Sequence, residues 1–352
     1  MSAEANAEAN VAADVEARSL PPRDRAALVL ACATVGGSTL GFVAAIVLTA
    51  QHGWSWLHFG LFAGMYLVTS LGVEGGLHRF FSHRSFSAGP VLTFLWGIAG
   101  SMAAQGPILF WVSVHRKHHA FADRDGDPHS PRPRGEGRLA GLRGLWHGHV
   151  GWLFTVRREG WAKFVPDLLR SRHVMLVDRY YVWWIALGLA LPAALGWAIT
   201  GRPVDALGGL LWGGFARMFV LDHVTWTVNS LGHTLGRRPY ETRDSSQNLA
   251  VLAPVSVGGS WHNNHHSQPS LAHNRHRAWQ LDITGGVIGL LDRAGLVSDV
   301  RYPPRMAEAG KGTEARKAQE KRGTAEPCRH SVPRRASSGS TREASGSRDS
   351  PP

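Results

Sequence analysis

Four long apolar segments are the feature that most restricts how this chain can fold. They cover residues 26–50, 56–77, 181–200 and 204–221, and a helix needs about 20 apolar residues to cross the hydrocarbon core of a bilayer. Inside lipid every backbone polar group must find a partner within the protein, which a helix achieves within one segment. The sequence therefore predicts an all-α membrane protein with four transmembrane helices. A buried helix pair in a soluble protein is the alternative for the first two segments.

The second segment is interrupted only by His58 near its start and Glu74 near its end, and a proline and an arginine lie in the third and fourth segments. Pro192 lies inside the third segment, where a proline predicts a local kink. Arg217 lies in the fourth, where a central arginine costs about 3 kcal/mol or more on insertion scales. We therefore expect Arg217 to face the protein interior or to mark the point where the helix leaves the lipid.

The two ends of the chain differ in composition from the membrane segments. Residues 1–24 are polar and lack the basic start and short apolar core of a cleaved signal, so we interpret them as a disordered cytoplasmic arm. Residues 306–352 are rich in Ser, Arg, Glu and Gly and are predicted to form a disordered basic tail. The membrane domain is then expected to cover residues 25–305.

Charge and cysteine content exclude two kinds of function. The formal net charge of +12 does not indicate a nucleic-acid partner, because the basic residues flank membrane segments, whose cytoplasmic loops carry excess Lys and Arg. The two cysteines, Cys32 and Cys328, predict neither a disulfide framework nor a thiolate metal site. Arginine outnumbers lysine 33 to 5, which is typical of a GC-rich, bacterial genome. We expect a multi-pass protein of the bacterial plasma membrane.

Histidine is concentrated in three short boxes. The boxes cover residues 78–83, 115–119 and 262–266, and together they hold eight of the 19 histidines: His78, His83, His115, His118, His119, His262, His265 and His266. In the second box the i, i+3, i+4 spacing puts three histidines on one face of a helix. Neutral imidazole is the commonest side-chain metal ligand. One such box could be a solvated helix face, but three in one chain predict a metal site.

The boxes can share a site only if they lie on the same side of the membrane. Two predicted crossings precede box one and two more precede box three. Residues 91–114, between boxes one and two, are also apolar and would separate these boxes if they crossed. We therefore predict that this segment lies in the membrane interface or dips and returns, so that the boxes form a helical cap on the cytoplasmic side, together with both termini.

The number and type of candidate ligands indicate the chemistry. Eight histidines exceed what one first-row metal needs, so two metals are expected. A nitrogen set with no obvious carboxylate partner suits iron, zinc or copper. Because the boxes adjoin membrane segments, the available substrates are lipids, and the difficult reaction on a lipid chain is C–H activation. That reaction requires a redox metal and oxygen, which favours two iron ions.

The boxes, read together with three further motifs, resemble those of one family. The motifs HRFFSH, HRKHH and HNNHH occur in order, with Gly-Asp-Pro-His at 126–129, His-Val-Gly-Trp at 149–152 and Asn-Ser-Leu-Gly-His at 229–233. Over about residues 60–305 the chain resembles the membrane fatty-acyl desaturases of the stearoyl-CoA desaturase type. The resemblance implies an oxidoreductase that introduces a cis double bond, at Δ9, into a saturated acyl-CoA or acyl-lipid while O2 is reduced to water.

The resemblance also implies roles for individual residues. Nine histidines would ligate two Fe2+ ions: His78, His83, His115, His118, His119, His233, His262, His265 and His266. Asn229 would reach one iron through water. His149 matches a family position but is expected to be structural. Six further histidines are expected to lie at the surface or beside the metal ligands without binding metal: His58, His147, His173, His223, His273 and His276.

A substrate tunnel follows from the same resemblance. Gln105, Trp111 and Thr225 match residues that bend the acyl chain beside the metal, and Tyr66 matches the tyrosine that closes the tunnel. Two departures stand out. Ser113-Val114 replace an Arg-Asp pair that contacts the CoA head group in the animal enzymes, and the family's acidic residue before box three is absent from residues 257–261. The first departure leaves the acyl carrier open.

Other partners and alternative functions complete the expectations. No haem, flavin or nicotinamide motif is evident, so electrons should come from a separate protein, whether ferredoxin, cytochrome or reductase. A related di-iron hydroxylase of alkyl or carotenoid chains is the nearest alternative, and a metal transporter is the alternative from another class. A transporter would place histidines within the membrane segments, whereas here the boxes follow them.

Overall fold

The computed structural model of the protein describes residues 25–155 and 160–303. The predicted disordered arm at 1–24 and the predicted basic tail at 306–352 lie outside these residues. Within the described part the chain is almost entirely helical, and its secondary structure is given below in chain order. The elements are α2 (Arg25–His52), α3 (Trp56–Leu71), the π-helix η1 (Gly72–Ser82), β1 (Ser87–Ala88), α4 (Pro90–Ser101), α5 (Ile108–Phe121), α6 (Ala140–His149), the 3-10 turns η2 (Gly151–Phe154), η3 (Trp161–Phe164) and η4 (Leu168–Arg170), α7 (Arg172–Arg179), α8 (Tyr181–Thr200), α9 (Pro203–Gly208), the π-helix η5 (Gly209–Ala216), α10 (Arg217–Ser230), the 3-10 turns η6 (Leu231–His233) and η7 (Ala250–Leu252), α11 (His262–Ser267), α12 (Ile283–Arg293) and β2 (Val297–Ser298).

Local sequence explains where several helices begin and end. The Ser55 hydroxyl accepts a hydrogen bond from the His58 amide at 3.3 Å and caps α3, which satisfies one of the free amides of the first turn. The Asp282 carboxylate caps α12 in the same way by accepting from the Gly285 amide at 2.9 Å. Gly201, at a φ of +68°, ends α8 in the left-handed conformation that glycine adopts without strain.

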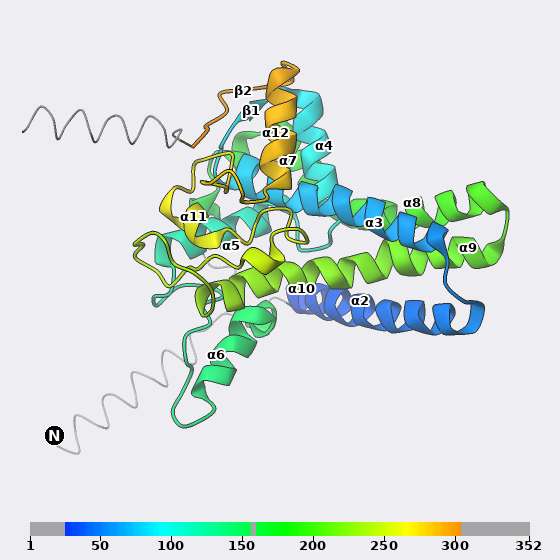
Figure 1. Ribbon diagram of the computed structural model, residues 1–352, viewed down its shortest axis with the longest axis horizontal. Coiled ribbons are helices and arrows are strands. Elements are labelled where there is room, and N and C mark those ends of the chain that lie inside the picture. Colours follow the sequence, from blue (N-terminus) through cyan, green and yellow to red (C-terminus); the bar gives the residue numbers. More distant parts are fainter. Residues whose placement is uncertain (1–24, 156–159, 304–352) are drawn as a thin grey trace, which may run out of the picture. The chain divides into compact units, whose positions relative to one another are not determined.

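Four helical rods are long and apolar enough to cross a membrane: Leu28–His52, Trp56–Ser82, Tyr181–Thr200 and Pro203–His233. The all-α fold with four membrane helices is therefore confirmed. The second rod extends past the predicted end at 77 because the π-helix η1 runs to Ser82. The fourth extends past 221 because α10 runs to Ser230 and the 3-10 turn η6 to His233. In Figure 1, α2, α3, α8 and α10 run side by side, and most of the remaining helices gather at one end of these rods.

Arg217 explains how a proline and an arginine are tolerated in neighbouring membrane helices. Pro192 has no backbone N–H, so the carbonyl four residues earlier, that of Gly188, has no helical donor. The Arg217 guanidinium donates to the Gly188 carbonyl at 3.3 Å and to the Met102 carbonyl at 2.6 Å. Its side chain is completely buried. The expectation that Arg217 faces the protein interior is therefore confirmed.

Residues 91–114 form two short helices rather than one long one. The apolar helix α4 ends at Ser101, and α5 begins at Ile108 after a turn that includes Gly106, which has a φ of +113°. Glycines allow α4 to lie directly against η1, since a Cβ on Gly72 would lie 2.3 Å from the Ala99 carbonyl carbon. That this segment does not cross the membrane stays a prediction, but the structure divides it into pieces of 12 and 14 residues.

One apolar core supports the end of the bundle where the histidine boxes lie. It joins Leu77 of η1, Ile108 and Val112 of α5, Val177 of α7 and Ile288 of α12. The strands β1 and β2 pair antiparallel, with Ser87 opposite Ser298, and hold the end of the described chain beside box one. The same core therefore fixes box one and box two relative to each other.

Candidate metal centre

Box one owes its geometry to a π-helix. On an α-helix, positions five residues apart lie about 140° apart around the axis, so His78 and His83 would point in different directions. In η1 the His83 amide instead donates to the His78 carbonyl at 3.2 Å, an i to i−5 bond. The two imidazoles then lie with ring centroids 5.0 Å apart. π-helical turns are rare and occur frequently at functional sites.

The histidines of all three boxes, together with His233, form two buried groups whose nitrogen atoms could hold metal ions. The first group, called here the five-histidine cluster, contains His78, His83, His115, His119 and His265. The second, called the four-histidine cluster, contains His118, His233, His262 and His266. The nine predicted ligands thus divide completely between the two clusters. Box two contributes to both, since His118 points to one cluster and its neighbours His115 and His119 to the other.

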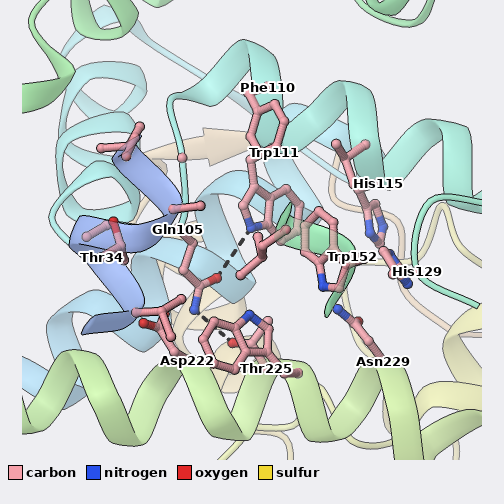
Figure 2. A pocket seen from close by; sticks show the side chains of 18 of the residues that line it. Thr34, Gln105, Phe110, Trp111, His115, His129, Trp152, Asp222, Thr225 and Asn229 are labelled. Atoms are coloured by element: carbon pink, nitrogen blue, oxygen red, sulfur yellow. Dashed lines mark hydrogen bonds between the residues drawn. The ribbon is translucent and has the colours of Figure 1, made fainter. Parts of the chain in front are cut away.

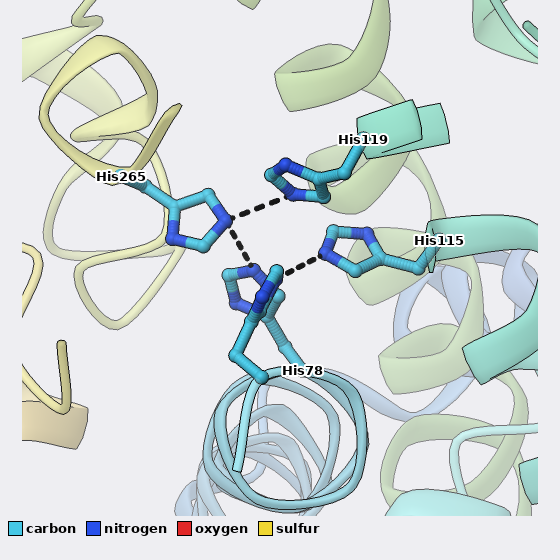
Figure 3. Close-up of side chains that lie close together, drawn as sticks. His78, His115, His119 and His265 are labelled. Atoms are coloured by element: carbon cyan, nitrogen blue, oxygen red, sulfur yellow. Dashed lines mark hydrogen bonds between the residues drawn. The ribbon is translucent and has the colours of Figure 1, made fainter. Parts of the chain in front are cut away.

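The distances between imidazole nitrogens fit a shared metal ion. Two nitrogens at about 2.1 Å from one ion, and at right angles to each other, lie about 3.0 Å apart. The Nε2–Nε2 distances are 2.7 Å for His83–His115, 3.0 Å for His78–His265, 3.1 Å for His119–His265 and 2.9 Å for His233–His262. Figure 3 shows His78, His115, His119 and His265 directed toward a common point. The buried Nε2 atoms of His118 and His266 have no hydrogen-bond partner in the described chain, which also fits ligation.

Carboxylates orient four of these histidines, and the sequence had indicated no carboxylate partner. Each accepts a hydrogen bond from a histidine Nδ1 and so leaves Nε2 free to face the cluster. The pairs are His78 with Glu74 at 2.9 Å, His118 with Asp127 at 3.0 Å, His233 with Asp123 at 2.8 Å and His266 with Asp244 at 2.7 Å. Two of these carboxylates could have been suspected from the sequence, because Asp123 and Asp127 belong to the acidic loop that follows box two.

Glu74 explains one departure from the family pattern. Its carboxylate also accepts from Arg79 and, at 3.1 Å, from Asn274. A Cβ on Gly259 would lie 2.8 Å from Oε2 of Glu74. Gly259 belongs to the segment before box three in which the family's acidic residue is missing. A carboxylate therefore lies against this segment, but it comes from the end of the second membrane helix.

Burial and charge act differently on individual histidines, since burial also holds the pKa of His262 and that of His266 well below the ordinary value. Burial, reinforced by the neighbouring histidines, holds the pKa of His119 and that of His265 well below the ordinary value, so both are neutral and able to bind metal. Burial would also lower the pKa of His118, but the Asp127 carboxylate outweighs it and the pKa is raised. The environment of His118 therefore stabilises a positive charge, as a ligand position beside a bound cation requires.

Two cavities adjoin the clusters and share four lining residues: Trp111, His115, Thr225 and Asn229. The first has about 890 Å³ of empty space, part of it open to solvent, and the second about 540 Å³. Asn229, the predicted water-mediated ligand, thus lies where the cavities meet. His78 and His262, one from each cluster, line the second cavity.

The predicted bend residues are in contact with one another. The Gln105 side-chain amide donates to the Thr225 hydroxyl at 3.0 Å, and the Trp111 indole N–H donates to the Gln105 carbonyl oxygen at 3.4 Å (Figure 2). All three residues line the first cavity. Tyr66 is not among the described residues that line either cavity. Its hydroxyl donates to the Val255 carbonyl at 2.7 Å, next to Ser256 of the second cavity.

The remaining histidines lie outside the two clusters. The structural interpretation of His149 agrees with its contacts to Ser230 and His223. His58 was expected at the surface or near the metal, and this was wrong: it is buried at the start of α3, with Nε2 2.9 Å from the Asp205 carboxylate of α9. His129 was not singled out, yet it lines the first cavity and stacks on His118 with ring centroids 4.3 Å apart.

Comparison with known proteins identifies the family. A family model described as fatty acid desaturase matches residues 54–284. Hex-5-enoyl-(acyl-carrier protein) acetylenase of Moorena producens (strain JHB) is 42% identical over 276 residues, which are 78% of this chain and 86% of that protein. The sn-1 stearoyl-lipid 9-desaturase of Synechocystis sp. (strain ATCC 27184 / PCC 6803 / Kazusa) is 33% identical, with 73% and 76% covered. The sn-2 palmitoyl-lipid 9-desaturase of Nostoc sp. (strain 36) is 34% identical, with 77% and 91% covered. This chain therefore belongs to the fatty acid desaturase family, as an oxidoreductase that acts on acyl chains.

Proposed function

We propose that this protein introduces a cis double bond at Δ9 into a saturated acyl chain, with two iron ions and O2. One observation carries the proposal: two cavities share Trp111, His115, Thr225 and Asn229 beside both histidine clusters. A chain that occupied both cavities would bend at these residues and present its middle carbons to the clusters. Two relatives named as 9-desaturases support the position of the double bond.

The proposed ligands are the nine clustered histidines, with Asn229 acting through water. When bound, two iron ions supply the O2-dependent oxidising power that removes two hydrogen atoms from the chain. The protein's own part is to orient the ligands and the substrate. The carboxylates of Glu74, Asp123, Asp127 and Asp244 hold imidazole rings, and the contacts among Gln105, Trp111 and Thr225 keep the bend of the cavity in place.

The acyl carrier is proposed to be something other than CoA held as in the animal enzymes. At the position of the animal Arg-Asp pair, Ser113 is buried and donates to the Phe110 carbonyl, while Val114 lines the first cavity. Neither side chain carries the positive charge that an arginine offers to a phosphate. The relatives include proteins named for lipid-bound, carrier-protein-bound and CoA-bound chains, so their names do not decide the carrier. Because the Arg-Asp pair is replaced, we favour an acyl-lipid or an acyl-carrier protein. We propose that electrons come from a separate ferredoxin, cytochrome or reductase.

The proposed orientation places the clusters and both termini on the cytoplasmic side of the plasma membrane. Single cysteines at the exposed positions Ser87 and Asp125 test it, since they flank the segment at 91–114. An impermeant thiol reagent should label both only after the membrane is opened, in a background with both native cysteines, Cys32 and Cys328, replaced. Labelling of one from outside and the other from inside would disprove the shared orientation.

Expression in a desaturase-deficient host tests the reaction itself. Gas chromatography with mass spectrometry of the total fatty acids should show a cis-9 monoene that is absent without the gene. A hydroxylated chain without a double bond would favour the hydroxylase alternative, and metal accumulation without any new lipid would favour a transporter. Sampling lipid, CoA and carrier-protein fractions at early times identifies the carrier, because the product appears first on the true substrate.

Triple-bond formation is a second candidate, favoured by the acetylenase at 42% identity. Such an enzyme removes two hydrogens from an existing double bond. Feeding terminal hexenoic acid beside stearic acid separates the two, because an acetylenase yields an alkyne from the first and leaves the second unchanged.

A further inference from the structure

Trp279 is an exposed tryptophan that lies close to a candidate metal ligand. The residue is 64% exposed, in the loop between α11 and α12. Its indole ring lies edge-on to that of Trp261, with ring centroids 5.3 Å apart. Trp261 is buried and immediately precedes His262, which belongs to box three and to the four-histidine cluster. Two adjacent indoles thus lead from the surface of the protein to a candidate metal ligand.

Hydrogen bonds connect the same loop to box three a second time. Gln280, the residue after Trp279, is buried, and its side-chain oxygen accepts from the backbone amide of Arg277 at 2.9 Å. The same oxygen accepts from the Asn264 side-chain amide at 3.0 Å. Asn264 lies on α11 next to His265, which belongs to the five-histidine cluster. The loop at 275–281 is therefore tied to residues that adjoin a ligand of each cluster.

The surface around Trp279 is basic. His276 of the same loop contacts the ring of Tyr240, with ring centroids 5.1 Å apart, so the loop at 237–243 lies alongside the loop at 275–281. The exposed charged residues of the two loops are mostly arginines: Arg237, Arg238, Arg243, Arg275 and Arg277, against Glu241. Leu281 adds an apolar side chain that is 47% exposed. An exposed aromatic group among several arginines suits an acidic protein partner, because tryptophan and arginine are enriched where binding energy is concentrated.

The proposed reaction requires electrons that neither the acyl chain nor O2 can supply in full. Forming the double bond releases two electrons and two protons from the chain. Reducing O2 to two water molecules takes up four electrons and four protons. Each turnover therefore needs two further electrons and two further protons, and the electrons come from the separate donor protein of the proposed function. Because electron transfer slows steeply with distance, that donor must bind where the clusters lie close to the surface.

Resting on the proposed function, we propose that the loop at 275–281, with Trp279 at its centre, is the docking surface for an acidic protein that donates electrons one at a time. The arginines attract such a partner and orient it, since complementary charge steers association. The contacts of Trp279 with Trp261, and of Gln280 with Asn264, bring the bound donor close to box three. An acidic acyl carrier fits this surface less well, because the described residues that line the two cavities include none from 275–281.

Binding of two acidic probes to the full protein in lipid nanodiscs tests the surface. The probes are an iron–sulfur ferredoxin and a small b-type cytochrome, and at least one should bind with a dissociation constant that rises with salt. Arg275→Glu combined with Arg277→Glu should weaken that binding at least about tenfold, because like charges across an interface repel. The matched control is Arg134→Glu combined with Arg138→Glu, which changes the net charge equally at exposed positions before α6 and should leave binding unchanged. The glutamine pair at 275 and 277 replaces the glutamate pair if the latter does not accumulate.

Electron delivery is measured separately, by mixing the reduced probe with iron-loaded protein without oxygen and following reoxidation of the probe by absorbance. The glutamate pair and Trp279→Ala should slow this step, whereas Trp279→Phe, which keeps an aromatic ring, should restore most of the rate. Reduction by dithionite, which needs no docking surface, and iron content should stay unchanged in every variant.

Three outcomes would overturn the proposal. Binding and transfer of both probes could be unaffected by the loop variants, as expected if the loop faces lipid. The arginine pair before α6 could weaken binding as much as the loop pair, as expected for a general effect of net charge. Reduction by dithionite could fall together with reduction by the probe, as expected if the loop only supports the clusters. Absence of any double bond when the unmodified protein receives electrons counts instead against the proposed function.

Discussion

The two histidine clusters meet the same chemical requirement with different means. The five-histidine cluster has more imidazoles but one carboxylate behind them, Glu74 on His78. The four-histidine cluster has one imidazole fewer and three carboxylates: Asp123, Asp127 and Asp244. A metal ion in the first cluster would have more neutral nitrogen ligands, and one in the second would have more negative charge around it.

The histidine side chains of the two clusters are held in place by different interactions. A carboxylate that accepts from Nδ1 fixes the imidazole and makes it a stronger donor to metal. Where three of four rings are held in this way, the site is ordered before metal arrives. Where one of five is held, order must come from packing. This packing involves the π-helix η1, which carries His78 and His83. The glycines at positions 72 and 76 of η1 allow α4 to lie close against it.

Removing one ligand from each cluster should have the largest effect on activity and on iron content. His118 and His119 are neighbours on α5 but belong to different clusters. His118→Ala and His119→Ala should each abolish turnover, because a lost ligand leaves a coordination position unfilled, and each should lower the iron content from about two per chain toward about one. Metal analysis of the purified protein is the measurement. Unchanged iron in both variants would show that the clusters are not the iron sites.

Neutralising the carboxylates should have a smaller effect on affinity. Asp127→Asn should weaken metal binding at the four-histidine cluster by about 10- to 100-fold, the usual cost of losing such a partner. Asp123→Asn combined with it should weaken binding further, while the five-histidine cluster keeps its metal. Competition with a chelator, followed by metal analysis, gives both affinities. Equal loss from both clusters would show that the carboxylates act on the fold rather than on one site.

Glu74 and Gly259 allow a compensating exchange. Gly259→Glu alone should lower iron content and activity, since its Cβ would come within 2.8 Å of the Glu74 carboxylate and add a like charge. Glu74→Gly alone should also lower both, because His78 loses its partner. The double variant should recover part of the loss by supplying the carboxylate from the other segment. If the double variant is as poor as the sum of the single ones, the two positions are not equivalent.

Tyr66 should have the smallest effect on rate and a specific effect on chain length. If it closes the substrate tunnel, Tyr66→Ala should admit longer chains while the double bond keeps its distance from the carboxyl end. Tyr66→Phe is the matched control, since it keeps the ring and loses only the hydrogen bond to the Val255 carbonyl. Cells fed saturated acids of graded length provide the profile. An unchanged cutoff in a well-expressed alanine variant would assign the tunnel end to another residue.

Sequence reasoning succeeded where a pattern is local. The four membrane helices follow from the lengths of the apolar segments, and the first eight clustered histidines follow from their spacing. His233 could be proposed only from family resemblance, because it is a single histidine 29 residues before its neighbour His262. The assignment of His118 to a different cluster from His115 and His119 could not be predicted, since all three share one helical face.

Tertiary packing decided the rest. The π-helix at box one depends on contact between η1 and α4, which no local propensity reveals. Glu74 read as an interruption in an apolar segment, and Asp244 belongs to no motif, so neither could be assigned to its histidine before the chain was folded.

The contact between His78 and His265 joins residues 187 positions apart, and this separation has a consequence for biogenesis. Box one is synthesised long before box three, so during translation the early histidines wait without their partners while two more membrane helices are inserted. Closing so long a loop has an entropic cost, and a metal ion that binds only the closed form offsets it by mass action. We therefore predict that metal loading is the final folding step, and that iron-starved cells accumulate inserted but protease-sensitive protein, whose histidine-bearing cap has not closed.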